Sequence, residues 1–203
     1  MKKLFVVFII LFVCFCHCNA QSRLDNVAVK FVESANNSDY NAVIRYGKEL
    51  YELNPKDDNV LQIMSVAYFE SAKIDSAFYC ASEAIKQNPD NYHALLTLGD
   101  ICFMIRDYEK AEAFYFKVLD LAPGYARAYL NLAKLYETVN LTDDAVEYYL
   151  YAVELFHENH FEKEVIHWTN HILSLDPENK QILKFIKQNH EKNFNNIIHG
   201  YSH

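Results

Sequence analysis

The stretch FKVLDLAPGYARAYLNLAKLYE, residues 116–137, contains one helical pattern that stops and a second that begins almost at once. Apolar side chains recur at helical spacing up to Leu121 and again after Gly124. Pro123 lacks the amide hydrogen that a helix interior requires, and Gly124 tolerates backbone angles that other residues avoid. The stretch therefore predicts two short helices joined by a tight break.

The break recurs at a constant interval along the chain. The prolines that close LNP, QNP and LAP are Pro55, Pro89 and Pro123, so that 89 − 55 = 34 and 123 − 89 = 34. Three alanines keep the same step, at Ala77, Ala111 and Ala145. Fixed self-similarity at such a period is typical of stacked supersecondary units, so the break separates repeats. We therefore predict an all-α fold, an α-solenoid of about four to five stacked antiparallel helix pairs.

Residues 1–20 have the order of a secretory signal peptide. Two lysines precede an apolar run over residues 4–16, and small residues frame a cut after Ala20. The run is shorter than the roughly 20 residues that cross a bilayer, although an uncleaved membrane anchor is the alternative. We expect export to a periplasm or to the outside of a bacterial cell, with no stable membrane span after cleavage.

The composition excludes one class of partner and disfavours one class of fold. The formal net charge is −8, and cleavage of the signal would remove two lysines. Such a chain repels phosphate backbones and has no basic stripe, so nucleic acid is not an expected partner. With only 4 Gly and 4 Pro, helices joined by tight turns are favoured over many short strands.

Two cysteines, Cys80 and Cys102, follow the signal segment, and both fall on apolar helical positions. Free cysteine is commonly a core residue, so buried thiols are favoured. An exported protein also permits a disulfide between the two, which is the alternative.

Three copies of the repeat keep their landmarks in register. Residues 92–125 carry Leu95, Leu98, Gly99, Ala111, Tyr115 and Pro123. Residues 58–91 carry Leu61, Tyr68, Ala77, Ala84 and Pro89. Residues 126–157 carry Tyr129, Leu132, Ala133, Tyr136, Ala145, Tyr149 and Ala152, with His157 in the place of proline. This pattern resembles the tetratricopeptide repeat family.

The predicted array covers residues 21–193, and its ends depart from the pattern. Residues 24–57 are a degenerate first repeat, with Lys30 and Phe31 in the Leu-Gly places. Residues 158–193 are either a divergent fifth pair or a capping helix followed by a trailing helix. Residues 194–203 are expected to be a flexible tail.

The resemblance implies a superhelix whose first helices line a concave groove for partner peptides. Candidate groove residues of the second repeat are Asn59, Gln62, Ile63, Val66, Phe69 and Glu70. Those of the third are His93, Leu96, Thr97, Asp100, Phe103 and Met104. Those of the fourth are Arg127, Leu130, Asn131, Lys134 and Thr138. The aromatic members have an alternative role, which is to pack between helices.

The predicted function is a non-catalytic scaffold that binds a partner protein or peptide in this groove. Some tetratricopeptide domains clamp a peptide C-terminal carboxylate with lysine, arginine and asparagine. Only Arg127 and Asn131 match that pattern here, so such a clamp is not expected. The alternative is a self-associating structural component of an envelope assembly, which would be a homo-oligomer.

No recognisable catalytic arrangement or cofactor-binding motif occurs, so neither an enzyme nor a cofactor is expected. The one cluster of metal-ligating residues spans residues 157–171 and contains four histidines. His167 and His171, four apart on a predicted helix, form a weak metal hypothesis, since zinc requires four ligands.

Overall fold

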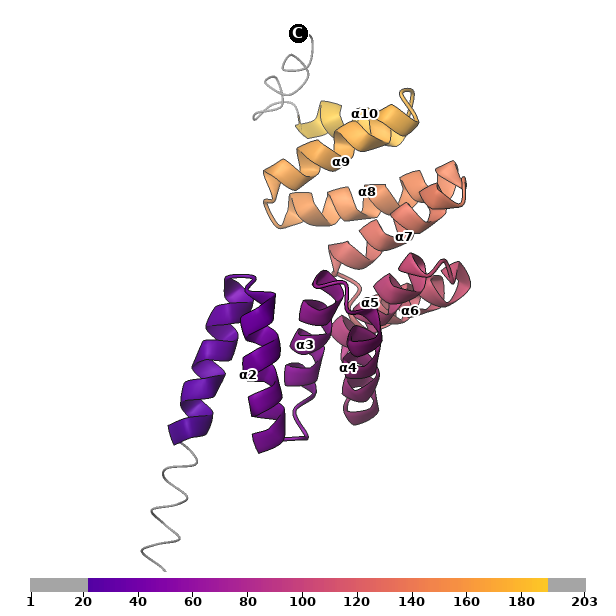
Figure 1. Ribbon diagram of the computed structural model, residues 1–203. Coiled ribbons are helices and arrows are strands. Elements are labelled where there is room, and N and C mark those ends of the chain that lie inside the picture. Colours follow the sequence, from indigo (N-terminus) through magenta and orange to yellow (C-terminus); the bar gives the residue numbers. More distant parts are fainter. Residues whose placement is uncertain (1–21, 190–203) are drawn as a thin grey trace, which may run out of the picture. The chain divides into compact units, whose positions relative to one another are not determined.

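The computed structural model describes residues 22–189, and every regular element in that range is a helix (Figure 1). An N-terminal helix runs through residues 22–36. It is followed by α2 (Tyr40–Leu53), α3 (Asp58–Glu70), α4 (Ile74–Gln87), α5 (Tyr92–Met104), α6 (Tyr108–Leu121), α7 (Ala126–Thr138), α8 (Thr142–Glu158), α9 (Glu162–Leu175) and α10 (Lys180–Asn189). The predicted all-α repeat fold is confirmed. The predicted signal peptide, the tail and the end of the predicted array (190–193) lie outside the described residues.

The chain divides within α5 into two compact units, an N-terminal unit that ends at Ile101 and a C-terminal unit that begins at Cys102. In the N-terminal unit, α2, α3 and α4 pack on one another in chain order. In the C-terminal unit, α6 to α9 do the same. Packing between sequence neighbours is what a repeat array requires, because each helix pair hides its apolar face against the next.

The helices of each pair are joined by a turn whose central residue has a positive φ. These residues are Ser38, Ala72, Arg106 and Asn140, which follow one another at the same interval as the prolines. In the last of these turns the Leu141 amide donates to the Tyr136 carbonyl at 2.8 Å. This is the left-handed termination that satisfies free carbonyls at a helix end. The period seen in the sequence is therefore also a period in backbone conformation.

The proline breaks between pairs have a different geometry. Asn54, Asn88 and Ala122 each end a helix with an amide that donates to the carbonyl four residues earlier, at 2.8 Å. The proline that follows cannot continue the ladder. The next helix then starts at a capping residue, such as Asn91, whose Oδ1 accepts from the Ala94 amide at 3.0 Å.

The alternation between left-handed turns and proline breaks changes after α8, because no proline follows this helix at the repeat position. The helix continues through His157 to Glu158, and the turn to α9 has its positive φ at His160. That is the turn used inside the earlier pairs, whereas Pro177 separates α9 from α10.

In the third and fourth repeats, a small residue on the first helix precedes a tyrosine on the second helix at a fixed separation. Gly99 precedes Tyr115 by the same interval by which Ala133 precedes Tyr149. Both tyrosines are buried. The first repeat reverses the order, because a large Phe31 stands in the place of the small residue and Gly47 in the place of the tyrosine.

The missing side chain at Gly47 provides the space that the large Phe31 needs. A Cβ at Gly47 would lie 2.5 Å from Met64 Cγ and 3.0 Å from Phe31 Cε2. Phe31 and Met64 both belong to the core cluster of the N-terminal unit. The degenerate repeat therefore closes by exchanging the sizes of two facing residues.

The predicted free thiols are confirmed. Cys80 and Cys102 are both unpaired and buried. Burial raises the pKa of the Cys80 thiol to about 11, so that thiol is protonated and unreactive near neutral pH. Burial also raises the pKa of Cys102.

We predict that Gly47→Ala destabilises the protein by up to about 2 kcal/mol, although alanine is the better helix former. The helix preference gains about 1 kcal/mol, and forcing a methyl group against Met64 costs about 1–3 kcal/mol. Thermal unfolding measures the difference, with the exposed Asn41→Ala of the same helix as control. Met64→Ala in the Gly47→Ala background should recover part of the loss. A higher melting temperature for Gly47→Ala would contradict the close contact.

Candidate functional site

The candidate residues on α3 form a mixed surface in the N-terminal unit. Asn59 and Glu70 are exposed, and Gln62 and Val66 are half-buried. Ile63 and Phe69 are half-buried and pack against the core cluster, so the alternative role for Phe69 agrees with its surroundings.

The α5 candidates are mostly inaccessible. Leu96 and Thr97 are each only 4% exposed, and Thr97 Oγ1 donates to the His93 carbonyl at 3.2 Å. These two side chains are therefore removed from the partner-facing set. His93 and Asp100 are half-buried.

In the C-terminal unit, some candidates are buried and others are accessible. Leu130 is buried in the core cluster and is also removed. Phe103 is half-buried, with its ring centroid 5.7 Å from that of Tyr108, whereas Met104 is 46% exposed. The remaining candidates lie on α7, where Arg127, Lys134 and Thr138 are exposed and Asn131 is half-buried.

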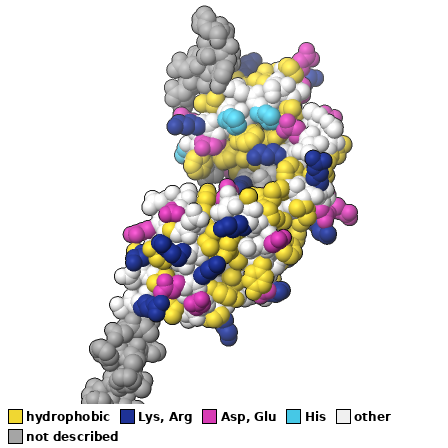
Figure 2. All heavy atoms as spheres, in the orientation of Figure 1, with side chains coloured by type: hydrophobic (Ala, Val, Ile, Leu, Met, Phe, Trp, Pro, Cys, Tyr) yellow, Lys and Arg dark blue, Asp and Glu magenta, His cyan; other side chains and the backbone are white. Residues whose placement is uncertain are grey.

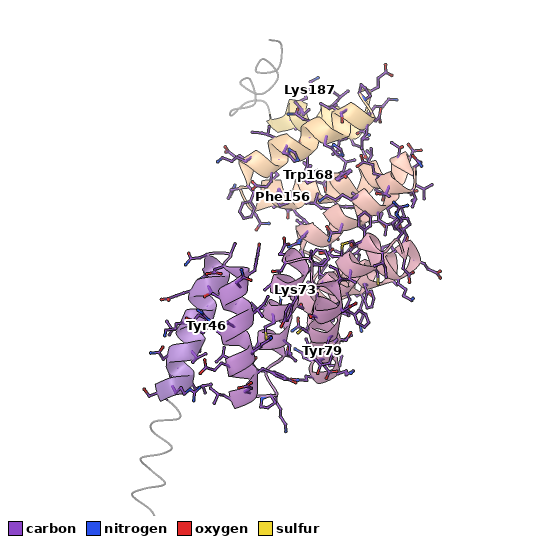
Figure 3. The ribbon with its side chains drawn as sticks, viewed as in Figure 1. Tyr46, Lys73, Tyr79, Phe156, Trp168 and Lys187 are labelled. Carbon is purple, nitrogen blue, oxygen red and sulfur yellow. The ribbon has the colours of Figure 1, made fainter. Side chains whose placement is uncertain are left out.

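The sequence pattern did not single out Trp168 on α9, which lies beside the α7 candidates (Figure 3). Its ring stacks on Tyr149 of α8, with centroids 5.1 Å apart and an interplanar angle of 18°. Lys134 Nζ lies over the ring at 5.4 Å, a cation–π contact between α7 and α9. His167 and His171 meet the ring edge-on. We call Lys134, Trp168, His167 and His171 the Trp168 platform.

Trp168 is the one tryptophan of the chain, and it stands next to His167 and three residues before His171. That spacing places Trp168 and His171 on one helix face. It is the feature of the sequence from which this cluster could have been predicted. Figure 2 shows histidine and lysine or arginine side chains beside hydrophobic surface on the C-terminal unit.

Glu137 of α7 holds two neighbours of the tryptophan ring in place. Its Oε2 accepts hydrogen bonds from Tyr149 Oη at 2.7 Å and from His171 Nε2 at 3.0 Å. Burial alone raises the pKa of Glu137, but the bonds from His171 and Tyr149 and the nearby Lys134 outweigh it, so that pKa lies below its ordinary value. Burial and the bond to Glu137 raise the pKa of Tyr149. Glu137 is therefore ionised near neutral pH and accepts hydrogen bonds from both Tyr149 and His171.

The metal hypothesis gains no further ligand from the structure. His171 uses its Nε2 in the bond to Glu137, and His167 is exposed. Among residues 22–189, no group of three His, Cys, Asp or Glu side chains is arranged to hold a metal ion. In the same range, no helix has the length and apolar character needed to cross a membrane.

Two tetratricopeptide repeat models match the chain, at residues 65–126 and 126–156. The chain is therefore a tetratricopeptide repeat protein across residues 65–156, as the landmark residues indicated. Its repeats make it a protein-interaction scaffold, and proteins of this fold are generally non-catalytic.

Solved structures with the same fold share little sequence with this chain. MamA 41-end from Desulfovibrio magneticus RS-1 is 20% identical, with a TM-score of 0.62 over 81% of this chain and 92% of that one. TTC0263, a thermophilic TPR protein of Thermus thermophilus, is 14% identical, with a TM-score of 0.59 over 81% and 97%. The first TPR of Spaghetti (RPAP3), bound to the HSP90 peptide SRMEEVD, is 20% identical, with a TM-score of 0.54 over 58% and 93%.

We predict that Glu137→Gln lowers the free energy of unfolding by about 1 kcal/mol at pH 7. A charge-assisted hydrogen bond is worth about 1.5–3 kcal/mol, and the partial exposure of this carboxylate reduces that value. Because its pKa is depressed in the folded protein, the stabilisation is present above the unfolded-state pKa of about 4.3 and is lost as the pH falls through the lower folded value.

Denaturant titrations from pH 7 downward test this prediction, with the exposed Glu52→Gln as control. The difference between wild type and Glu137→Gln should shrink below pH ~4.3. A difference that is independent of pH would show that the lost stability is not linked to the charge on Glu137.

Proposed function

We propose that the scaffold binds a partner peptide across α7 and α9, on the Trp168 platform. The observation that carries the proposal is a half-buried tryptophan whose ring contacts both Tyr149 and Lys134 at the surface of a repeat unit. Both side chains fix the ring, and a fixed aromatic ring costs little entropy when it binds. Aromatic and arginine side chains are also the residues most enriched at binding hot spots.

The charges of α7 favour a peptide with an acidic side chain. Arg127 and Lys134 of α7 are exposed, and Glu137, the only carboxylate of that helix, accepts hydrogen bonds from Tyr149 and His171. Asn131 lies between the two cations in the sequence and is half-buried. We therefore expect an acidic segment with an apolar residue.

The Spaghetti domain binds an acidic peptide on the same fold, and its likeness to this chain extends to the fold alone. It supports the class of ligand, because that domain is a tetratricopeptide repeat bound to a peptide with acidic residues. It does not support a C-terminal carboxylate clamp here, since the lysine and asparagine partners of Arg127 and Asn131 are not in the sequence.

We predict that acidic peptides with one Leu, Met or Phe change the fluorescence of Trp168, the chain's only tryptophan. Replacing Arg127 and Lys134 by Glu should weaken binding at least tenfold, about 1.4 kcal/mol or more. Lys117→Glu, an exposed residue of α6, is the matched control and should leave the affinity unchanged. Equal binding by wild type and the double variant would contradict the site.

We also propose that the chain is exported, on the basis of residues 1–20. The order of charged, apolar and small residues supports cleavage after Ala20 and a periplasmic or extracellular place of action. We predict that expression of the full sequence in a bacterial host yields a product whose first residue is Gln21. N-terminal sequencing of the fractionated protein measures this, and Ala20→Arg should block cleavage. A cytoplasmic product that starts at Met1 would refute export.

A further inference from the structure

Charge is segregated between two helices of the C-terminal unit. α8 carries five carboxylates and no lysine or arginine, at Asp143, Asp144, Glu147, Glu154 and Glu158. α10 carries three lysines and no carboxylate, at Lys180, Lys184 and Lys187. The chain as a whole has a net charge of −8, so a helix with only cations is an exception to the composition.

A hollow of about 500 Å³ lies between these two helices. Glu147, Tyr151 and Glu154 line it from α8, and Lys184 and Phe185 line it from α10. The apolar Leu150 and Val153 also line it, and Asp176 and Asn179 join from the connection before α10. The hollow therefore combines an apolar surface with more negative than positive charge.

Among residues 22–189, no ion pair neutralises the charges around the hollow. In the part that the structure describes, none of the three α10 lysines forms an ion pair. The Glu147 carboxylate accepts one hydrogen bond, from Tyr151 Oη at 3.3 Å. Opposite charges on neighbouring helices that do not reach each other leave both available to another molecule.

The outward face of α10 forms a ridge that matches this hollow. Ile182 and Ile186 are buried, so the face left outside is Leu183, which is 46% exposed, flanked by Lys180 and Lys187. Tyr151 beside the hollow is 44% exposed. At 1.5 Å per residue, α10 is about 15 Å long and α8 about 25 Å, so one helix fits along the other.

We propose that this surface joins two copies of the chain, with α10 of each copy lying in the hollow between α8 and α10 of the other. The ridge and the hollow are adjacent on one unit, so a two-fold axis lets each copy supply both. Leu183 then packs against the apolar lining, and the lysines face Glu147 and Glu154 of the opposite copy. No residue of the Trp168 platform lines the hollow, and the dimer does not depend on the proposed peptide binding.

A second copy is the occupant that the chain itself favours over another cationic segment. α10 has the opposite charge to α8, an exposed apolar residue at its centre and a suitable length. Every molecule carries it, so its concentration always equals that of the hollow.

The test is a charge exchange followed by sedimentation of protein purified from full-length expression. Variant one carries Lys180→Glu, Lys184→Glu and Lys187→Glu, and variant two carries Glu147→Lys, Glu154→Lys and Glu158→Lys. We expect wild type to dimerise in the micromolar range and to dissociate as salt rises from about 0.05 to 0.5 M. Each variant alone should be monomeric, because its two surfaces then have the same sign. An equimolar mixture should restore a dimer.

The control carries Lys56→Glu, Lys73→Glu and Lys117→Glu, which change the net charge as variant one does at exposed sites elsewhere. It should dimerise as wild type does, and circular dichroism should show the same helix content in all variants. A wild-type monomer at about 200 µM, about two hundredfold above a dissociation constant of about 1 µM, would overturn the proposal, even if it bound a lysine-rich peptide. Assemblies larger than a dimer, or a dimer formed by variant one alone, would overturn it as well.

Discussion

No helix pair in this protein can hide its apolar face without a neighbour, and the architecture follows from that constraint. The core of the N-terminal unit joins residues of several consecutive helices, and so does the core of the C-terminal unit. Burial of these side chains, at roughly 25 cal/mol per Å² of apolar surface, is the main stabilising contribution to such an array. The turns only set the register, with a left-handed residue inside each pair and a proline between pairs.

The same constraint explains how the irregular ends are accommodated. In the first repeat Phe31 occupies a position that is small in the later repeats, and Gly47 provides the space that Phe31 and Met64 fill. After α8 the proline break is replaced by a left-handed turn at His160. A repeat can depart from its pattern when the volume removed from one helix reappears on its partner, because the packing density between them is then kept.

The C-terminal unit contains one region in which polar and charged groups are paired and another in which the charges stay apart. Around Trp168, each charge near the ring has a partner: Glu137 holds Tyr149 and His171, and Lys134 lies on the ring. Between α8 and α10 the charges face a hollow and stay apart. The first arrangement produces a rigid surface that can recognise a ligand, and the second produces a surface whose charges a second chain can complete. Two binding surfaces of opposite character can thus lie on one repeat unit.

The sequence by itself determined the helices, the repeat period and the family, because proline, glycine and apolar spacing act locally and repeat. It also indicated the free, buried state of Cys80 and Cys102. It did not determine which candidate side chains face solvent: Leu96, Thr97 and Leu130 are buried, although their spacing placed them beside exposed residues. Only the tertiary structure brought Trp168, Glu137 and Tyr149 together and set α8 beside α10. Those contacts join residues from different helices, and their distances depend on how the helices pack, which no local pattern encodes.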